Sequence, residues 1–379
     1  MTIQIDGTNT LNKGAELMLY AVLEEIEKSH PDALIYYNSN YVGEEKLNIK
    51  SSLKIKKRLA LHYGRYPKAI LRRLKLPYTY FTSKYPIDNI DLVLDAAGFQ
   101  FSDQWNYSKE SLVVIEKYYK KLKENGAKIV FLPQAFGPFE TTEGRKSIEI
   151  INKYSDLIIA RERISLEHLL KAGGDKNKVL MYSDFTLSVK GKLSEEYNFV
   201  KGKVCIIPNQ KMITHTKTGS LEYVDFMEQT IREIQRKGKD VFLLNHEGEG
   251  DFDICNQINA KFENKLRVVS GLNSKEVKGV IGASFMVISS RFHGVASALN
   301  QGVPCLATSW NHKYEMLFED FKQNNRILDV KNSIIGDEML KIDELLKDYD
   351  NIKSILQEAK INLNKANTEM WTKVWSLIK

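Results

Sequence analysis

Two successive series of short apolar runs, each separated by amphipathic stretches, constrain the fold of this chain most strongly. The alternation is clearest from Asp91 onward and is typical of βα units that build a parallel sheet. The first series predicts strands at 3–5, 33–37, 92–95, 128–132, 157–160 and 179–182. The second series predicts strands at 204–208, 241–245, 266–269, 285–289 and 304–308. The sequence therefore predicts an α/β protein with two open parallel sheets.

The two series predict two Rossmann-like domains. Segment 190–203 is polar and lacks a strand pattern, so we place the boundary near residue 195, which gives domains at 1–195 and 196–379. In the second series, helices are predicted at 223–237, 274–281 and 295–300. Residues 337–379 are also predicted to be helical, and the last helix could pack back on the first domain. Two such sheets would bind a ligand across a cleft at the carboxyl ends of their strands, which is the GT-B type of architecture.

Length and composition agree with two domains. The chain has 379 residues, of which 43% are hydrophobic and 27% charged, which is average usage for a soluble protein. No apolar run reaches the ~18 to 20 residues of a membrane-spanning helix, and the N-terminus lacks a signal-peptide pattern, so a cytoplasmic location is expected. The three cysteines are odd in number and widely spaced, which predicts reduced core residues.

A basic insert at 46–86 carries twelve Lys or Arg residues and no Asp or Glu, whereas the rest of the chain has 43 basic and 48 acidic residues. Leucine, isoleucine and tyrosine are interspersed with these cations, as in segments that lie on an anionic lipid surface. Peripheral docking at the inner face of the cell membrane and a solvated basic loop or helical hairpin are equally weighted alternatives. Nucleic acid is not an expected partner, because no nucleic-acid motif accompanies the charge.

The strongest local signal lies at 284–315. An apolar strand ends at Ser289, and Arg291 and His293 follow where a helix begins. A cation and an imidazole at a helix N-terminus form a natural site for phosphate or carboxylate. The next strand brings Lys313 to the same edge of the sheet. The structural alternatives are that His293 caps the helix, that Arg291 anchors the loop and that Lys313 is solvated.

In the first half of the chain, a predicted strand runs directly into Arg161 and Arg163. A guanidinium at a strand end can hold a planar carboxylate or phosphate bidentately, and Arg161 is the better candidate. The alternative for each is an ion pair with Glu162 or Glu167 at the start of the helix. Asp184 follows a later strand, and for it a structural role is favoured over that of a general base.

Three loops, at 8–16, 95–103 and 133–140, have a glycine-bearing strand-to-helix form that lets a ligand approach the backbone. Four polar side chains in them could orient sugar hydroxyls: Asn9, Asn12, Asp103 and Gln134. Tight-turn formation is an equally weighted alternative for each loop. None of the loops has the pattern of a phosphate-binding Walker loop or a dinucleotide fingerprint. Weak evidence for a metal comes from the cluster of His246, Glu247, Glu249, Asp251 and Asp253, and we predict none.

Taken in order, these segments resemble the polysaccharide pyruvyl transferase family. The matching pieces are NKGAE at 12–16, DAAG at 95–98, PQAFGP at 133–138, ARERIS at 160–165, SD at 183–184, RFH at 291–293, GVP at 302–304 and Lys313. The resemblance covers residues 3 to 320, and the arginine-x-histidine segment is its most distinctive part. The chain departs from the family at Ala96 and Ala97, where a glycine-rich turn is usual, and at Ala15, where an acidic residue is usual.

The resemblance implies a GT-B-like fold and transfer of pyruvate from phosphoenolpyruvate to two hydroxyls of a sugar, which forms a ketal during cell-surface polysaccharide synthesis. It places Arg161, His293 and Lys313 at the positions that hold or activate phosphoenolpyruvate, with no further cofactor. The first domain would take the sugar or lipid-linked oligosaccharide, and the second would take phosphoenolpyruvate. In this scheme His293 is the general acid, Arg161 clamps carboxylate or phosphate, and Lys313 contacts phosphate.

Two other functions remain open from the sequence. A GT-B glycosyltransferase that uses a nucleotide sugar would share the two-domain arrangement and an anion site in the second domain. A non-catalytic protein that binds saccharide is the less favoured alternative. This alternative predicts that His293→Ala leaves saccharide binding and biological function intact, whereas an enzyme would lose its function.

Overall fold

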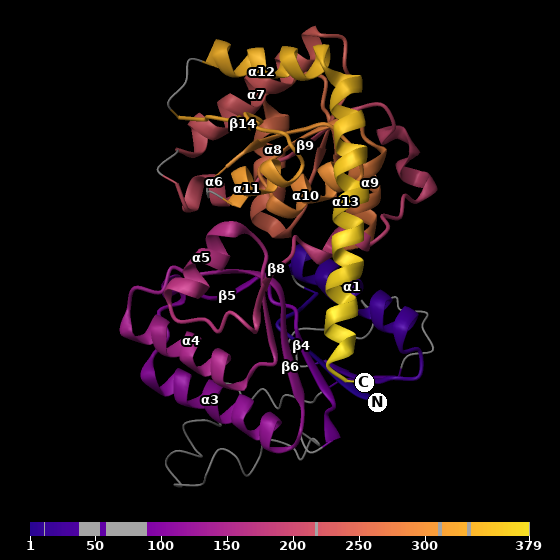
Figure 1. The fold of residues 1–379 in the computed structure, drawn as a ribbon. Coiled ribbons are helices and arrows are strands. Elements are labelled where there is room, and N and C mark those ends of the chain that lie inside the picture. The colour runs from indigo at the N-terminus through magenta and orange to yellow at the C-terminus, as the bar shows by residue number, and fades with distance from the viewer. Residues whose placement is uncertain are drawn as a thin grey trace, which may run out of the picture. The chain divides into compact units, whose positions relative to one another are not determined.

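The computed structural model describes residues 1–10, 12–37, 54–57, 89–216, 219–309, 313–331 and 335–378. The chain divides into two compact units (Figure 1). Unit 1 comprises Met1–Thr186 and Ala366–Lys379, and unit 2 comprises Leu187–Lys365. The division falls before the polar stretch near residue 195, because that stretch contributes Val200, and partly buried Tyr197 and Phe199, to the core of unit 2.

Unit 1 contains an eight-stranded sheet whose paired strands all run parallel. Its main path has the order β3-β2-β1-β4-β6-β7-β8, and β5 pairs with β6. The strands are β1 (Thr2–Asp6), β2 (Leu34–Tyr37), β3 (Lys54–Lys57), β4 (Leu92–Asp95), β5 (Phe99–Phe101), β6 (Lys128–Phe136), β7 (Leu157–Ala160) and β8 (Val179–Met181). The direction of strand order reverses between β1 and β4. In open α/β sheets, ligands bind at such a switch point, beyond the carboxyl ends of the strands.

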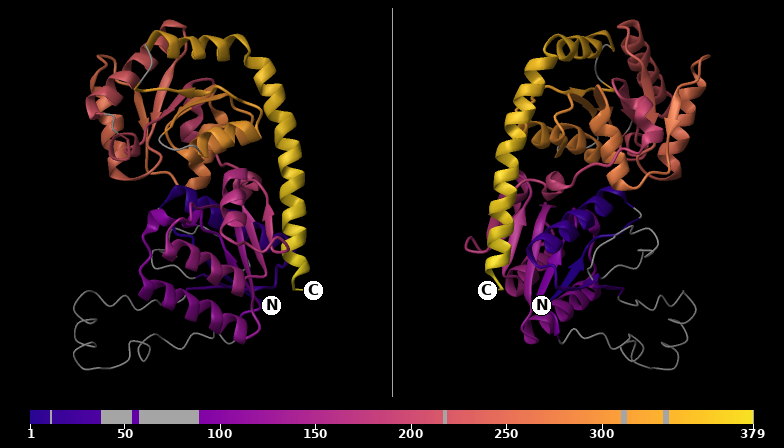
Figure 2. Two further views of the ribbon diagram at one scale, coloured as in Figure 1. Left: turned by 60° about the vertical axis from the view of Figure 1, so that its left-hand side comes forward. Right: turned by 90° about the vertical axis from the view of Figure 1, so that its right-hand side faces the viewer.

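Helices cover both faces of this sheet. The helices α3 (Lys109–Glu124), α4 (Thr142–Tyr154) and α5 (Arg163–Lys171) share one apolar cluster with the sheet. Helix α1 (Lys13–Ser29) lies on the opposite face, as right-handed crossovers require. The last part of α13 (Tyr349–Ser376), drawn in yellow in Figure 2, belongs to unit 1. There the Trp375 indole donates to Glu25 at 3.2 Å.

Unit 2 repeats the pattern with six parallel strands in the order β11-β10-β9-β12-β13-β14. They are β9 (Val204–Ile207), β10 (Val241–Leu244), β11 (Arg267–Val269), β12 (Met286–Ser289), β13 (Cys305–Thr308) and β14 (Ile327–Leu328). The helices of this unit are α6 (Lys211–Thr214), α7 (Ser220–Arg236), α8 (Gly248–Ala260), α9 (Ser274–Ala283), α10 (Phe292–Asn300), α11 (Lys313–Asp320), α12 (Ile335–Lys347) and most of α13. The switch point lies between β9 and β12.

All eleven predicted strands are confirmed, most within one or two residues of the expected ends. Strand β6 is longer than predicted and ends at Phe136, and the short strands β3, β5 and β14 were not predicted. The predicted helices correspond to α7, α9 and α10, and α10 begins at Phe292, three residues before the predicted start. The C-terminal residues are helical as expected, in α12 and α13. The three cysteines are buried in the core of unit 2 as free thiols.

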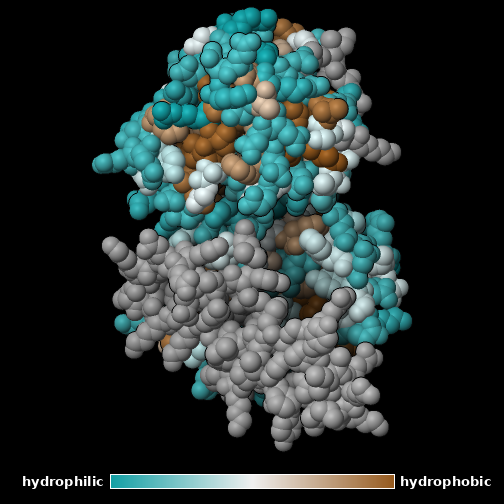
Figure 3. All heavy atoms as spheres, turned by 180° about the vertical axis from the view of Figure 1, so that it is seen from behind, coloured by the Kyte–Doolittle hydropathy of each residue, from teal (hydrophilic) through white to brown (hydrophobic). Residues whose placement is uncertain are grey.

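Apart from β3, the basic insert at 46–86 lies outside the described residues. Among those that are described, no helix is long and apolar enough to cross a membrane. Hydrophilic side chains cover most of the face of unit 2 that Figure 3 shows, with smaller apolar patches between them.

Candidate active site

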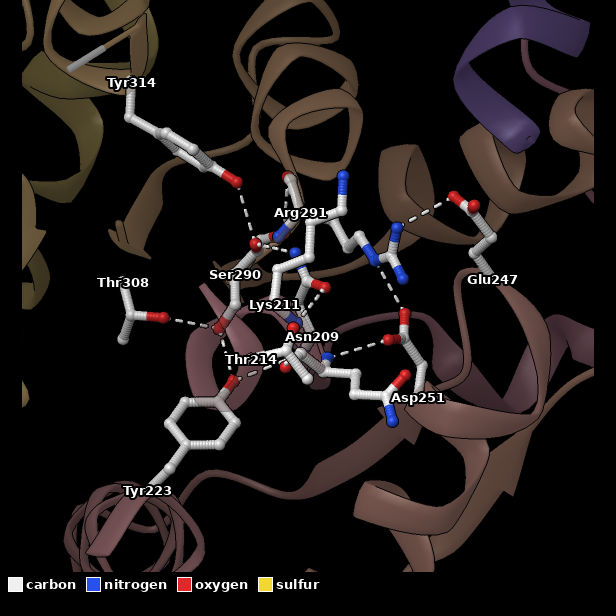
Figure 4. Close-up of polar contacts among 12 residues, drawn as sticks. Asn209, Lys211, Thr214, Tyr223, Glu247, Asp251, Ser290, Arg291, Thr308 and Tyr314 are labelled. Atoms are coloured by element: carbon white, nitrogen blue, oxygen red, sulfur yellow. Dashed lines mark hydrogen bonds and ion pairs between the residues drawn. The ribbon is translucent and has the colours of Figure 1, made fainter. Parts of the chain in front are cut away.

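A network of buried hydroxyl groups holds the junction between β12 and α10 at the switch point of unit 2 (Figure 4). The Ser290 hydroxyl lies 2.5 Å from that of Tyr223 and also hydrogen-bonds that of Thr308. The Ser290 carbonyl accepts from the side-chain amide of Asn209 and from the Tyr314 hydroxyl, both at 2.8 Å. Side chains from four other elements or their flanking loops therefore fix the backbone directly before Arg291, which gives this junction a defined conformation.

Arg291 is held by two carboxylates. Its Nε donates to Asp251 at 2.7 Å and its Nη1 donates to Glu247 at 2.9 Å. Burial by itself would lower the pKa of Arg291, but the hydrogen bond to Asp251 and the charges of Asp251 and Glu247 outweigh it and raise that pKa. The Asp251 side chain is fully buried, and its other oxygen accepts from the Gln210 amide at 2.9 Å. These contacts favour the alternative in which Arg291 anchors the loop.

Lys211 is a cation in this region that sequence reasoning missed. It follows β9 at the carboxyl edge, is half-buried and lies beside Arg291 (Figure 4). Burial, followed by the charge of Arg291, lowers the pKa of Lys211, whereas Glu247 and Asp251 act in the opposite direction. The position of Lys211 shortly after a predicted strand was the only sign of it in the sequence. That it lies next to Arg291 follows only from the pairing of β9 with β12.

The structure brings His293 and Lys313 to one aromatic ring. The His293 imidazole makes an edge contact with Phe292, with ring centroids 5.4 Å apart, and the Lys313 Nζ lies 5.0 Å from the centroid of the same ring. Phe292 also packs edge-on against Tyr314. A Cβ added to Gly294 would lie 2.4 Å from the Ser289 hydroxyl, so glycine allows this helix start to pack closely on its strand. His293 and Lys313 thus lie at the same end of the sheet.

The acidic residues considered for a metal have other contacts. Glu247 and Asp251 pair with Arg291, and Asp253 is exposed on α8. Within the described residues, no group of three or more His, Cys, Asp or Glu side chains is arranged to hold a metal ion.

In unit 1, Arg161 is buried at the end of β7. Its Nε lies 3.4 Å from Glu162 and its Nη1 lies 3.7 Å from Asp184. Asp184 also accepts from the backbone amide of Thr186 at 2.9 Å and from its hydroxyl at 2.6 Å. The contact with Glu162 agrees with the structural alternative for Arg161, an ion pair at the start of the helix. The contacts of Asp184 with Thr186 agree with the structural role favoured for it, that of a helix cap. Arg163 is exposed and pairs with Glu167 at 2.9 Å.

The predicted sugar-orienting residues at the first loops take part in local backbone structure. Asn9 accepts from the Asn12 amide at 2.9 Å, and Asn12 caps α1 by accepting from the Ala15 amide at 3.0 Å. Asp103 accepts from the amides of Glu140 and Thr141 at 2.5 and 3.2 Å. These contacts favour the tight-turn alternative for Asn9, Asn12 and Asp103.

Gln134 is fully buried and takes part in a polar network at the switch point of unit 1. Its amide nitrogen lies 3.4 Å from Asp95, and its carbonyl oxygen accepts from the Gln100 amide at 3.3 Å. Asp95 ends β4 and is the register partner of Asp6, which ends β1. Sequence reasoning identified Gln134 but missed this carboxylate pair, because its members meet only through strand pairing.

Two parallel-sheet α/β units with polar junctions at their switch points define a class, and comparison with solved structures identifies it as the GT-B fold. The chain is similar to HepE from Anabaena in complex with UDP and glucose, with a TM-score of 0.61 and 13% identity over 99% of this chain and 100% of that one. A putative UDP-N-acetylglucosamine 2-epimerase from Listeria monocytogenes gives 0.59 and 10% over 94% and 91%. Trehalose-6-phosphate synthase OtsA gives 0.59 and 11% over 99% of both chains.

The chain belongs to the polysaccharide pyruvyl transferase family, whose sequence model matches residues 12–312. It is therefore a transferase of polysaccharide biosynthesis. No curated protein matches the chain. The predicted GT-B-like fold and the family resemblance are confirmed by these findings.

Proposed function

We propose that the protein transfers pyruvate from phosphoenolpyruvate to two hydroxyls of a sugar and so forms a cyclic ketal. Family membership over residues 12–312 carries this proposal. The grouping of His293 and Lys313 on Phe292 supports it, because the reaction needs a proton donor beside a cation.

The proposed chemistry balances without a redox partner. A proton from His293 goes to the methylene carbon of phosphoenolpyruvate, one sugar hydroxyl adds to the neighbouring carbon, and the carbon–oxygen bond to phosphate breaks. A second hydroxyl of the sugar then closes the ring. Of the two hydroxyl protons released, one restores His293 and the other leaves with phosphate. Histidine suits the first step, since its ordinary pKa lies closest to neutral pH.

The donor is a multiply charged anion, so cations close to His293 are the candidates to hold it. We assign anion binding to Lys313, whose Nζ lies over the ring of Phe292, and to Lys211, which lies beside Arg291. Arg291 pairs with Asp251 and Glu247, and we assign to it the support of the loop that carries His293. The role of Arg161 as a clamp on the donor stays a prediction from the family resemblance.

Ligand-dependent thermal unfolding tests the donor. A ligand that binds only the native state stabilises it by about 2.7 kcal/mol at a hundred times its dissociation constant. We expect phosphoenolpyruvate to raise the melting temperature of the wild type and to raise that of Lys313→Met much less. UDP-glucose is the competing ligand. A response to UDP-glucose and none to phosphoenolpyruvate would favour a glycosyltransferase.

We also propose that the acceptor is lipid-linked and that the basic insert binds the anionic membrane surface. The twelve cations at 46–86 support this, since each adds about 1 kcal/mol near such a surface. Vesicles with anionic lipid should sediment the wild type, and those of neutral lipid should not. Reversing four of these charges should lower activity on a lipid-linked acceptor and spare a soluble analogue; equal loss on both would refute this role.

A further inference from the structure

Trp105 presents a large aromatic ring at the surface of unit 1. The residue is 51% exposed, whereas Trp371 and Trp375 are buried. An indole is a flat, rigid apolar group, and its exposure forgoes much of the stabilisation that burial would give. Single exposed apolar residues are common in soluble proteins, so the position and the support of Trp105 decide what its exposure means.

Trp105 lies beyond the carboxyl ends of strands in unit 1, where sheets of this type bind their ligands. Strand β5 runs parallel to the last residues of β6, and Phe101 is the register partner of Phe136. A short helix, Asp103–Trp105, follows β5 directly. Trp105 is therefore carried past the carboxyl end of β5, in the unit to which the proposed function assigns the sugar acceptor.

Hydrogen bonds hold the short helix that carries Trp105. The Asp103 carboxylate accepts from the amide of Thr141 at 3.2 Å and from its hydroxyl, which ties the helix to the loop before α4. Ser102 caps the helix by accepting from the Gln104 amide at 3.1 Å. Asp103, a predicted partner of sugar hydroxyls, thus supports the neighbouring indole.

A second ring and a closed loop flank the indole. The ring centroids of Phe99 and Trp105 lie 5.6 Å apart with an angle of 58° between the planes. Asn106 follows with φ +46°, in the left-handed region, and the Tyr107 hydroxyl donates to the Gln100 carbonyl at 2.8 Å. The indole is therefore held before any ligand arrives, which lowers the entropy lost on binding.

Residues 99–108 offer a ligand aromatic and amide groups with little charge. Asp103 is the only Asp, Glu, Lys, Arg or His among them. Gln104 and Asn106 stand on either side of Trp105 in the chain, and both are exposed. A carboxamide can donate to one hydroxyl and accept from another, and the negative face of an indole attracts the weakly positive C–H groups of a sugar ring. This combination suits a neutral sugar better than an anion.

We propose that Trp105 is the stacking platform for a neutral sugar ring of the acceptor, with Gln104 and Asn106 as partners of its hydroxyl groups. This inference rests on the proposed function, in which unit 1 takes the acceptor. Trp105 contributes affinity for the acceptor and takes no part in bond making.

Glycan binding tests the platform without any donor. An array of immobilised neutral oligosaccharides should bind the wild type, and should bind Trp105→Ala about thirtyfold more weakly, the loss typical of a tryptophan at the centre of an interface. Trp105→Phe keeps an aromatic face and should recover most of this binding. Val114→Ala is the matched control, because Val114 on α3 is 66% exposed, and it should bind as the wild type does.

Nuclear magnetic resonance of the wild type makes this test independent of how the variants fold. In protein with labelled tryptophan, a glycan bound from the array set should shift the indole resonance of Trp105 and leave those of Trp371 and Trp375 in place. A bound glycan that leaves the Trp105 resonance unchanged would overturn the proposal.

Steady-state kinetics with a glycan that accepts pyruvate show which step depends on Trp105. Trp105→Ala should raise the acceptor KM about thirtyfold and leave kcat and the KM for phosphoenolpyruvate unchanged, because a contact equally strong in the ground and transition states affects binding alone. A lower kcat with an unchanged acceptor KM would overturn the stacking role.

A lipid contact is the competing role for an exposed indole, since tryptophan is enriched at membrane interfaces. The proposal predicts that Trp105→Ala and the wild type sediment equally with vesicles of phosphatidylcholine and phosphatidylglycerol. Reduced sedimentation of the variant, with unchanged binding to the glycan array, would assign Trp105 to lipid and overturn the proposal.

The outcomes separate this inference from the proposed function. A wild type that transfers pyruvate, with an acceptor KM that Trp105→Ala leaves unchanged, would overturn the platform alone. A wild type that binds neutral glycans through Trp105 but transfers no pyruvate would overturn the proposed function and leave the platform standing. A wild type that neither binds a glycan nor transfers pyruvate would overturn both.

Discussion

Arg291 shows how one side chain can be both part of a family motif and part of the scaffold. Its guanidinium is bound by Asp251 and Glu247, and removal of one partner from a buried ion pair leaves an uncompensated charge. Asp251→Ala should therefore lower the free energy of unfolding by about 3 kcal/mol, measured by urea denaturation. Asp253→Ala is the control on the same helix, where the side chain is exposed, and should change the stability little. Equal effects of the two substitutions would refute the anchoring role.

Substitution of Lys211 tests whether this single side chain contributes to the proposed phosphoenolpyruvate site. Lys211→Met should weaken phosphoenolpyruvate binding about tenfold, because a hydrogen bond to a charged group contributes about 1.5 kcal/mol or more. Calorimetric titration measures this loss directly. Lys201→Met is the matched control, since Lys201 is exposed and precedes β9, whereas Lys211 follows it. Unchanged binding by Lys211→Met would remove this lysine from the site.

The sequence revealed site residues that lie next to one another in the chain and missed those that meet through the sheet. Arg291 and His293 could be identified because a strand and a helix start flank them within a few residues. The contacts of Arg291 with Asp251, and of Asp95 with Asp6, depend on which strands become neighbours. A single sequence contains no local pattern for such pairings.

At the scale of elements, the close approach of the turns after β1 and β4 makes a specific prediction. Gly7 and Gly126 both have a positive φ, +76° and +86° respectively. A Cβ added to Gly7 would lie against Ala97, whereas a Cβ added to Gly126 would meet no other atom closely. Gly126→Ala should cost about 1 kcal/mol of backbone strain. Gly7→Ala should cost about 1 to 3 kcal/mol more, because overpacking adds to that strain. Thermal unfolding of the two variants compares these costs, and equal destabilisation would contradict the close contact.

The alternation of apolar runs was sufficient to predict eleven strands, because strands buried on both faces of a parallel sheet are continuously apolar. It was not sufficient for β5 and β14, because strands of three and two residues are too short to show a period. Strand β6 continues through Pro133 and Gln134 to Phe136, where the pattern suggested a loop. Its additional residues pair with β5 and β7, so the extension depends on tertiary contacts.

At the scale of the whole molecule, the two units use the same topology for different purposes. Each sheet has its switch point beside the first strand of its unit, at β1 and β4 or at β9 and β12. Unit 1 presents a buried carboxyl pair there, whereas unit 2 presents cations and an imidazole. The opposite character of the two switch points agrees with the proposed division between an uncharged sugar acceptor and an anionic donor.

The most direct test of this account is mass spectrometry of glycans incubated with the protein and phosphoenolpyruvate, with phosphate release followed in parallel. The account predicts a gain of about 70 mass units on the acceptor, which is roughly pyruvate minus water, with one phosphate released for each ketal formed. His293→Ala should abolish both signals while retaining the wild-type melting temperature. Transfer at the wild-type rate by His293→Ala would contradict the account. So would consumption of a nucleotide sugar when the glycan gains no mass on incubation with phosphoenolpyruvate.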